Sequence, residues 1–172
     1  PVTTTDELIP SGETSSFRSN PLKLAEFALS RKDPDYVPLA KEVQKAEKAR
    51  EEGNCPLEAV AELKSVWDKI KVSFPDMNSE NTGIGSTIFA VKPGDGSARE
   101  QAASCQKVLG GWANIANEYA TKRYRSNLIN WGMLPFLTTD DALLEKGSWV
   151  LVKNVKEGLE SNTPMKAYVV HH

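Results

Sequence analysis

The sequence predicts an α/β fold, and the alternation of two kinds of segment leads to that class. Segments whose apolar residues recur at helical spacing alternate along the chain with short runs of β-branched and apolar residues. The chain has 172 residues, of which 40% are hydrophobic. That is about the length of one domain, with enough apolar side chains to form a core. We find no internal repeat, so a single domain over 1–172 is expected.

Helices are predicted for most of the first half. Residues 1–20 are rich in Ser and Thr and predict a loop with one short strand at 8–9. A helix is expected over 21–31, because Asn20 suits an N-cap and Pro21 suits the first turn. Two further helices, over 38–52 and 56–71, are separated by Gly53 and predict a helical hairpin. Their many charges are interpreted as a solvated helix face.

Strands and helices alternate in the second half. A buried strand is predicted over 87–91, followed by a turn rich in Pro and Gly at 93–97 and a helix that begins at Ser97 and ends before Gly110-Gly111. A strand over 112–117 and a helix over 119–131 follow. Late strands are expected at 148–152 and 166–170.

Composition excludes several classes of site. The two histidines, His171 and His172, end the chain and are either native or the remainder of a purification tag. A Ser-His-Asp triad or a His-ligated zinc site built from this chain alone is therefore excluded. Two cysteines, Cys55 and Cys105, are too few for a four-thiolate cluster. They are expected to be free thiols, since nothing suggests secretion.

The ends of the chain and its charge bear on location and partners. No apolar run is long enough for a membrane span, and no signal peptide is visible, so the sequence favours a cytoplasmic protein without membrane contact. The formal net charge of −2 does not favour nucleic acid as a partner. Because the chain begins with Pro1 rather than Met, we expect a piece of a longer protein.

The turn over 94–100 is the most informative segment. Gly94 and Gly96 allow backbone N–H groups to approach a ligand closely. The helix that follows directs its free N–H groups and positive dipole end to the same place, which favours an anion. Arg99 can offer a bidentate fork to a carboxylate. The pattern suits an acidic substrate with Ser97 as base or nucleophile, although Ser97 as a simple N-cap explains the same residues. Neither a dinucleotide fingerprint nor a P-loop is present.

Three segments resemble the aconitase superfamily, in the family's order. GDGSAREQAA at 94–103 resembles the Gly-x-Gly-Ser-Ser-Arg-Glu-His-Ala-Ala motif. Thr4-Thr5-Asp6 with Arg18, twelve residues beyond the aspartate, resembles the start of the family's C-terminal swivelling domain. The segment 125–135 resembles its Asn-Leu…Gly-x-Leu-Pro segment. Residues 33–75 have no counterpart in the resemblance and are expected to be a helical-hairpin insert.

The resemblance implies an α/β swivelling domain of β/β/α layers with a mixed, partly barrel-like sheet. The family moves a hydroxyl group within a hydroxy di- or tricarboxylic acid through an alkene. The resemblance implies that Ser97 removes the proton from carbon. It also implies that Arg18 and Arg99 hold substrate carboxylates, with Gly96 and Ala98 beside them. Asp6 supports an acid/base histidine from another domain. A [4Fe-4S] cluster would be bound by the partner domains, with no metal ligand in this chain.

Three positions depart from the family pattern. Ala98 replaces the second serine, Gln101 the histidine, and Glu7 the histidine after Thr-Thr-Asp. The sequence therefore favours a divergent single-chain aconitase-like hydratase over a separate isopropylmalate-type small subunit. The alternative is a relative that has lost catalysis and binds a partner such as RNA, for which 122–125 supplies the one compact basic group.

Overall fold

The computed structural model describes residues 2–10, 20–96, 99–139, 141, 144–161 and 164–170, without the side chain of Pro21. The helices are α1 (Thr5–Leu8), α3 (Pro21–Ala25), α4 (Tyr36–Glu51), α5 (Pro56–Ala59), α6 (Ala61–Ser73), α7 (Arg99–Val108), α8 (Lys122–Asn130) and α9 (Val155–Ser161), with a 3₁₀ turn η2 (Ser79–Asn81). The strands are β1 (Val2–Thr4), β2 (Ser86–Ala90), β3 (Lys92–Asp95), β4 (Gly111–Ala116), β5 (Leu134–Leu137), β6 (Trp149–Val152) and β7 (Ala167–Val170).

The predicted α/β class is confirmed, and the strands form three small sheets. β2, β4 and β5 make a parallel sheet in the order β2-β4-β5. β1 pairs in parallel with β3, and β6 pairs antiparallel with β7. Both strand directions are therefore present, as expected. The expected partly barrel-like single sheet is not seen, since the strands of the described segments divide into separate sheets and close no barrel.

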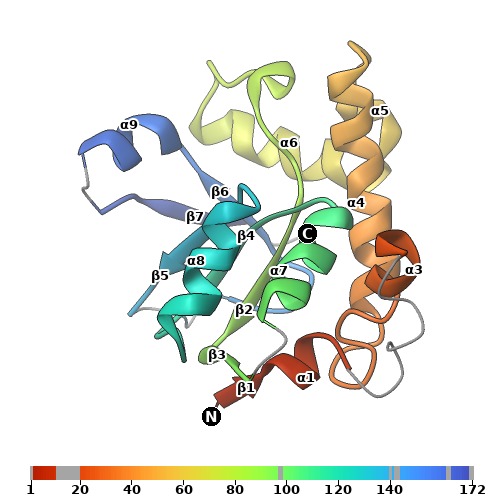
Figure 1. The fold of residues 1–172 in the computed structure, drawn as a ribbon. Helices are drawn as coiled ribbons and strands as arrows, with labels where there is room; N and C mark the ends of the chain where they lie inside the picture. The colour runs from red at the N-terminus through yellow and green to blue at the C-terminus, as the bar shows by residue number, and fades with distance from the viewer. Residues whose placement is uncertain are drawn as a thin grey trace.

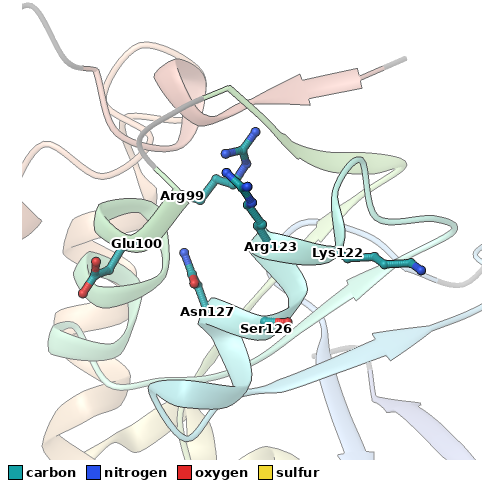
Figure 2. Close-up of a pocket in the computed structure, with 6 residues that line it drawn as sticks. All are labelled: Arg99, Glu100, Lys122, Arg123, Ser126 and Asn127. Carbon is teal, nitrogen blue, oxygen red and sulfur yellow. The ribbon is translucent and has the colours of Figure 1, made fainter.

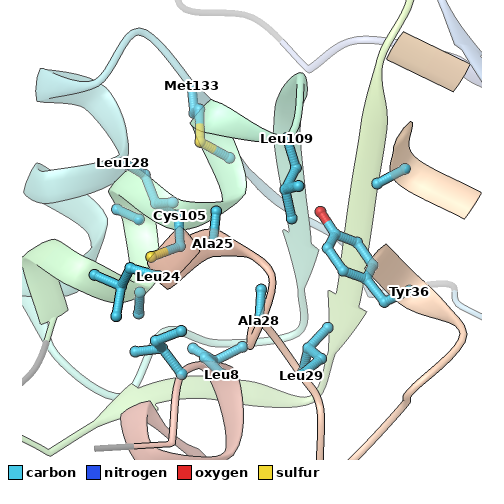
Figure 3. Close-up of a cluster of buried hydrophobic side chains, with 14 of the residues drawn as sticks. Leu8, Leu24, Ala25, Ala28, Leu29, Tyr36, Cys105, Leu109, Leu128 and Met133 are labelled. Carbon is cyan, nitrogen blue, oxygen red and sulfur yellow. The ribbon is translucent and has the colours of Figure 1, made fainter. Parts of the chain in front are cut away.

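The main core surrounds α7. In Figure 1, α3 and α4 lie on one side of this helix and α8 on the other, and α7 contacts both α3 and α8. Its buried face consists of small and medium side chains, which lets the neighbouring helices approach closely. The cluster is shown in Figure 3 and includes Leu8, Leu24, Ala103, Cys105 and Leu128. The glycine turn at 94–96, which precedes α7, is thus attached to the main core through this helix.

The predicted helical hairpin is present, with one interruption. α4 ends next to Gly53, whose positive φ of 80° is the left-handed conformation expected of a C-terminal glycine. The helix predicted over 56–71 is divided at Val60, which is extended and buried against Ala46 and Leu63. Glu47 is also buried here, where it accepts a hydrogen bond from the Ile84 N–H at 2.7 Å.

The last two strands pack on α6 rather than on the parallel sheet. Leu151 of β6 lies in a buried cluster with Val66, Trp67 and Ile70. Nε1 of Trp149 donates to Glu62 at 3.0 Å. The pair of strands β6 and β7 therefore packs against α6.

Some local expectations were wrong. The strand predicted at 8–9 is the end of α1, because a capping box between Thr4 and Glu7 starts a helix there. Strands β1, β3 and β5 and helices α1 and α9 were not predicted. Within the described segments, no helix combines the length and the apolar character needed to cross a bilayer.

Candidate active site

Pairing of β1 with β3 brings two distant motifs together. Thr4 lies opposite Asp95 in the register, so the Thr-Thr-Asp segment ends beside the Gly-x-Gly turn. Thr5 is buried, and its hydroxyl lies against Gly96: a Cβ at this glycine would overlap Thr5 Oγ1. Gly96 also has a φ of +127°, a conformation that residues with a side chain rarely adopt. Gly96 is therefore required both for its conformation and for the close approach of Thr5.

The other glycine of the turn is held by α8. Gly94 has a φ of +104°, and a Cβ there would overlap the ring of Tyr124. The Gly94 carbonyl accepts from Thr121 Oγ1 at 3.3 Å, and the same oxygen of Thr121 accepts from the Tyr124 N–H at 3.1 Å. The N-cap of α8 is thus also a clamp on the glycine turn.

One buried and one half-buried tyrosine add to this support. Tyr124 is fully buried, and its hydroxyl accepts from Nδ2 of Asn114 at 2.6 Å. The hydroxyl of Tyr119 lies 3.0 Å from the Phe136 carbonyl and 3.2 Å from the Asn114 carbonyl. Burial raises the pKa of both phenols well above the ordinary value, so both remain neutral at physiological pH. Their hydrogen bonds tie the Asn114 and Phe136 backbone and the Asn114 side chain to the elements around the turn.

A polar pocket of about 370 Å³ opens between the start of α7 and the first turns of α8. Figure 2 shows the six lining residues, Arg99, Glu100, Lys122, Arg123, Ser126 and Asn127. Arg99 and Arg123 extend toward the same end of the pocket, whereas Glu100 and Lys122 point away from them (Figure 2). The arrangement presents two guanidinium groups to one space.

Asn127 joins the two helices at this pocket. With its amide assigned so that the oxygen faces α7, which satisfies both of its ends, Asn127 accepts from the Glu100 N–H at 3.0 Å and donates to the Arg123 carbonyl at 3.2 Å. One N–H in the first turn of α7 is therefore occupied by Asn127. The sequence-based expectation that these N–H groups are free for a ligand is wrong for this one.

Asp6 lies at the surface beside the two motifs. Its carboxylate forms an ion pair with Arg31 at 3.3 Å, and about half of each side chain is exposed. The neighbouring Glu7 accepts from the Thr4 N–H at 2.8 Å in the capping box and lies 3.5 Å from Nζ of Lys32. Glu7, which stands where the family motif has histidine, thus serves the local structure of α1.

The structure describes only some of the expected site residues. Ser97, Ala98 and Arg18 lie outside the described residues. Asp6 and Gly96 belong to segments that the fold joins, and Arg99 lines the pocket. Sequence reasoning missed the roles of Thr5 and Asn127, and it left Arg123 open between holding a substrate and lying on the surface of a helix. Asn127 already stood in a segment of the resemblance, which was a usable signal.

The described part of the chain offers no metal centre. No three His, Cys, Asp or Glu side chains in it are grouped so that they could hold an ion. Cys105 is buried, and burial raises the pKa of its thiol to about 11. Cys55 is exposed and free. These residues do not fit a [4Fe-4S] cluster, so no catalytic step of this chain is derived through one.

Comparison with known families gives a match to the aconitase C-terminal domain over residues 42–141. The chain belongs to this family. The matched region contains the glycine turn, Arg99 and all of α7 and α8, and it begins after the Thr-Thr-Asp segment. It also begins within α4, so it runs through most of the helical hairpin.

Solved structures agree with this family in fold. The chain is similar to 3-isopropylmalate dehydratase from Methanocaldococcus jannaschii, with a TM-score of 0.52 and 17% sequence identity. The similarity covers 99% of this chain and 81% of that chain. The comparison with curated proteins gives no significant match. The aconitase C-terminal domain of this chain thus has the overall fold of a hydro-lyase component.

Proposed function

We propose that this chain is the swivelling domain of an iron–sulfur hydro-lyase. The reaction would be the reversible dehydration of a hydroxy di- or tricarboxylic acid. The chain would be one domain of a longer protein, and the cluster-bearing domains would be its partners. One observation supports the proposal: in a member of the aconitase C-terminal domain family, the β1–β3 pairing joins the Thr-Thr-Asp segment to the glycine turn, which Arg99 follows in the sequence.

Ser97 is assigned the proton transfer at carbon. Its alkoxide would take a proton from the carbon next to the one that bears the hydroxyl. The electrons of that C–H bond form the double bond, and the hydroxyl takes up a proton and leaves as water. Hydration reverses these steps. A serine hydroxyl is a weak acid, so its alkoxide needs positive potential, which Arg99 and the start of α7 supply.

Arg18 and Arg99 are assigned to the substrate carboxylates, with Gly96 and Ala98 beside them. A guanidinium binds a carboxylate through two parallel hydrogen bonds, which also fixes its orientation. Gly96 keeps the backbone close to the bound acid, since no side chain intervenes. Ala98 removes one hydroxyl from the family pattern, and for that reason we do not assign citrate as the substrate.

Asp6 is assigned to support an acid/base histidine of a partner domain. Its exposed carboxylate is accessible from outside this chain. Arg31 holds that carboxylate in place, and the histidine would share it. The cluster would bind to the partner domains, because the cysteines of this chain are not grouped. We place the enzyme in the cytoplasm, where free thiols such as Cys55 and Cys105 persist.

The test uses the full-length protein, reconstituted anaerobically with iron and sulfide. Citrate, isocitrate, methylcitrate, homocitrate and isopropylmalate are screened for alkene formation by ultraviolet absorbance. Ser97→Ala should lower kcat by about 10²–10⁴-fold, the usual contribution of a positioned proton transfer. Ser104→Ala is the matched control, because it removes a half-buried serine hydroxyl from α7, the helix that follows Ser97 in the sequence.

Two results would overturn the proposal. If a protein with an intact cluster converts none of these acids, the assigned substrate class is wrong. If Ser97→Ala and Ser104→Ala have the same activity on the converted acid, Ser97 is not the base and its role is that of a helix cap.

A further inference from the structure

Two arginines of separate helices share the pocket, and no carboxylate of the described residues pairs with either. Arg99 begins α7 and Arg123 lies in the first turn of α8, and both line the space between these helices. Within the described segments, neither guanidinium forms an ion pair. Nε of Arg99 is buried and has no hydrogen-bond partner there. A buried N–H without a partner is costly, so this donor indicates a missing acceptor.

The positions of the two arginines are fixed before any ligand binds. Asn127 connects the first turn of α7 to α8 by accepting from the Glu100 N–H and donating to the Arg123 carbonyl. Thr121 ties the start of α8 to the glycine turn that precedes α7. The two helix starts therefore keep their separation. Because the backbone of both helix starts is already held, an anion has to order only the two side chains when it binds.

The charges around the pocket favour an anion. Lys122 adds a third cation to the lining. Glu100 is the acidic residue of the lining, and its side chain points away from both guanidinium groups (Figure 2). Like charges in one space repel each other unless a counter-charge lies between them. The described residues supply no such counter-charge at this end of the pocket.

We propose that Arg123 is a second carboxylate-binding residue that acts together with Arg99. The two would grip one carboxylate of a small di- or tricarboxylic acid from opposite helices. The anion site follows from the pocket and its charges. Its assignment to the substrate rests on the proposed function. Arg123 would then help to determine which acid is accepted, a role that the glycine-turn motif does not contain.

A small carboxylate fits this place better than RNA does. The guanidinium groups converge on one solvent-open pocket between two helices and do not form an extended row of cations along a surface. Binding of a nucleic acid backbone requires several cations in a row along such a surface. Planar guanidinium groups in pairs suit the bidentate recognition of a carboxylate.

The experiment measures binding to the full chain by isothermal titration calorimetry. The probe is propane-1,2,3-tricarboxylate, which has no hydroxyl and cannot be dehydrated. Arg123→Ala and Arg99→Ala should each weaken binding by roughly 10- to 100-fold, the usual effect of removing a charged hydrogen-bond partner. Arg123→Lys should recover part of the affinity, because lysine restores the charge but not the fork.

Arg125→Ala is the matched control. Arg125 is exposed on the same helix and does not line the pocket, so its removal changes the net charge equally. The affinity of the Arg125→Ala protein for the probe should stay within about twofold of the wild type. Circular dichroism melts of all variants show whether each protein is folded, and Arg123→Lys tests the role even if Arg123→Ala is unstable.

Several results would overturn the proposal: no binding by the wild-type chain, wild-type affinity in Arg123→Ala, or an equal loss in Arg125→Ala. Displacement of the probe by a short single-stranded RNA, with a loss of RNA binding in Arg125→Ala, would identify a nucleic acid surface instead. Failure of the proposed function is a separate result. If the full-length protein converts no hydroxy acid but the chain binds the probe through Arg99 and Arg123, the anion site stands and its assignment to a hydro-lyase substrate does not.

Discussion

Gly94 has no room for a side chain, and this makes it more critical than most glycines of the chain. A methyl group there would meet the ring of Tyr124, which is fully buried and cannot move away. The backbone at Gly94 is also in the positive-φ region, at +104°. We expect Gly94→Ala to lower the free energy of unfolding by more than about 3 kcal/mol, through both strain and overlap. Urea unfolding followed by circular dichroism measures this change.

Gly53 is the matched control for conformation alone. Its φ is +80°, and nothing lies within 4 Å of the position that a Cβ would occupy. Gly53→Ala should therefore cost only the backbone strain, about 1 kcal/mol. Equal effects of the two substitutions would show that contact between Tyr124 and the glycine turn does not hold the site in place.

At the residue scale, a shared role could be predicted for residues that are close together in the sequence. Gly94, Gly96 and Arg99 stand within six positions, so their shared role could be predicted from spacing. Thr5 and Arg123 approach this turn only through strand pairing and helix packing. No pattern of neighbouring residues carries that information, because it depends on the tertiary fold. Asn127 lies on α8 and caps α7, and this role also depends on the tertiary fold.

At the scale of elements, α8 is the part that connects the turn to the pocket. Thr121 caps α8 through the Tyr124 N–H and also donates to the Gly94 carbonyl. Thr121→Ala should lower the free energy of unfolding by about 1–2 kcal/mol, the upper part of the range for a lost N-cap. It should also raise the KM of the full-length enzyme, because Arg123 and Arg99 lose their fixed separation.

Asn20→Ala provides the comparison for this prediction. Asn20 caps α3 at an exposed position, where its side chain accepts from the Lys23 N–H at 3.2 Å. Its loss should cost about 0.5–1 kcal/mol and leave KM unchanged. Thr121→Ser keeps the hydroxyl and should behave like the wild type. A wild-type KM in Thr121→Ala would refute the idea that this cap aligns the pocket.

The elements that were predicted correctly are those with a strong local signal. α4 has a charged composition rich in helix-forming residues and β2 is a β-branched apolar run, and the ends of both agree with the expectation to within a few residues. β3 contains Pro93 and Gly94, which are typical of turns. It exists as a strand because it pairs with β1, which is far away in the sequence. The division of the second hairpin helix at Val60 likewise reflects packing against Ala46 and Leu63 rather than a helix-breaking residue.

At the scale of the whole molecule, a buried thiol and several tyrosine hydroxyls link the free energy of unfolding to pH. Burial raises the pKa of the Cys105 thiol to about 11 and that of the Tyr36 hydroxyl to about 12. The phenols of Tyr119 and Tyr124 are raised as well. In the unfolded chain these groups titrate at ordinary values, near 9 for the thiol and 10 for the phenols. The folded state therefore keeps protons that the unfolded state has already lost.

The sign of the effect follows from this difference. Because the folded pKa values are raised, the contribution is complete below pH 9 and is lost as pH rises toward 11 and beyond. Cys105, which is 2% exposed, would account for about 2–3 kcal/mol of that loss. We expect the urea midpoint to be constant from pH 7 to about pH 8.5 and to fall steadily above it. Unfolding curves at successive pH values measure it.

Cysteine variants separate the thiol from the tyrosines. Cys105→Ala should flatten the decline between about pH 9 and pH 11, because the alanine protein has no buried thiol to ionise. The tyrosines should still cause a fall at higher pH. Cys55→Ala removes an exposed thiol and should leave the whole profile unchanged. If the wild type and Cys105→Ala show the same slope in this range, the thiol is accessible to water in the folded chain. The packing of α7 against α3 and α8 would then be looser than the buried cluster in Figure 3 indicates.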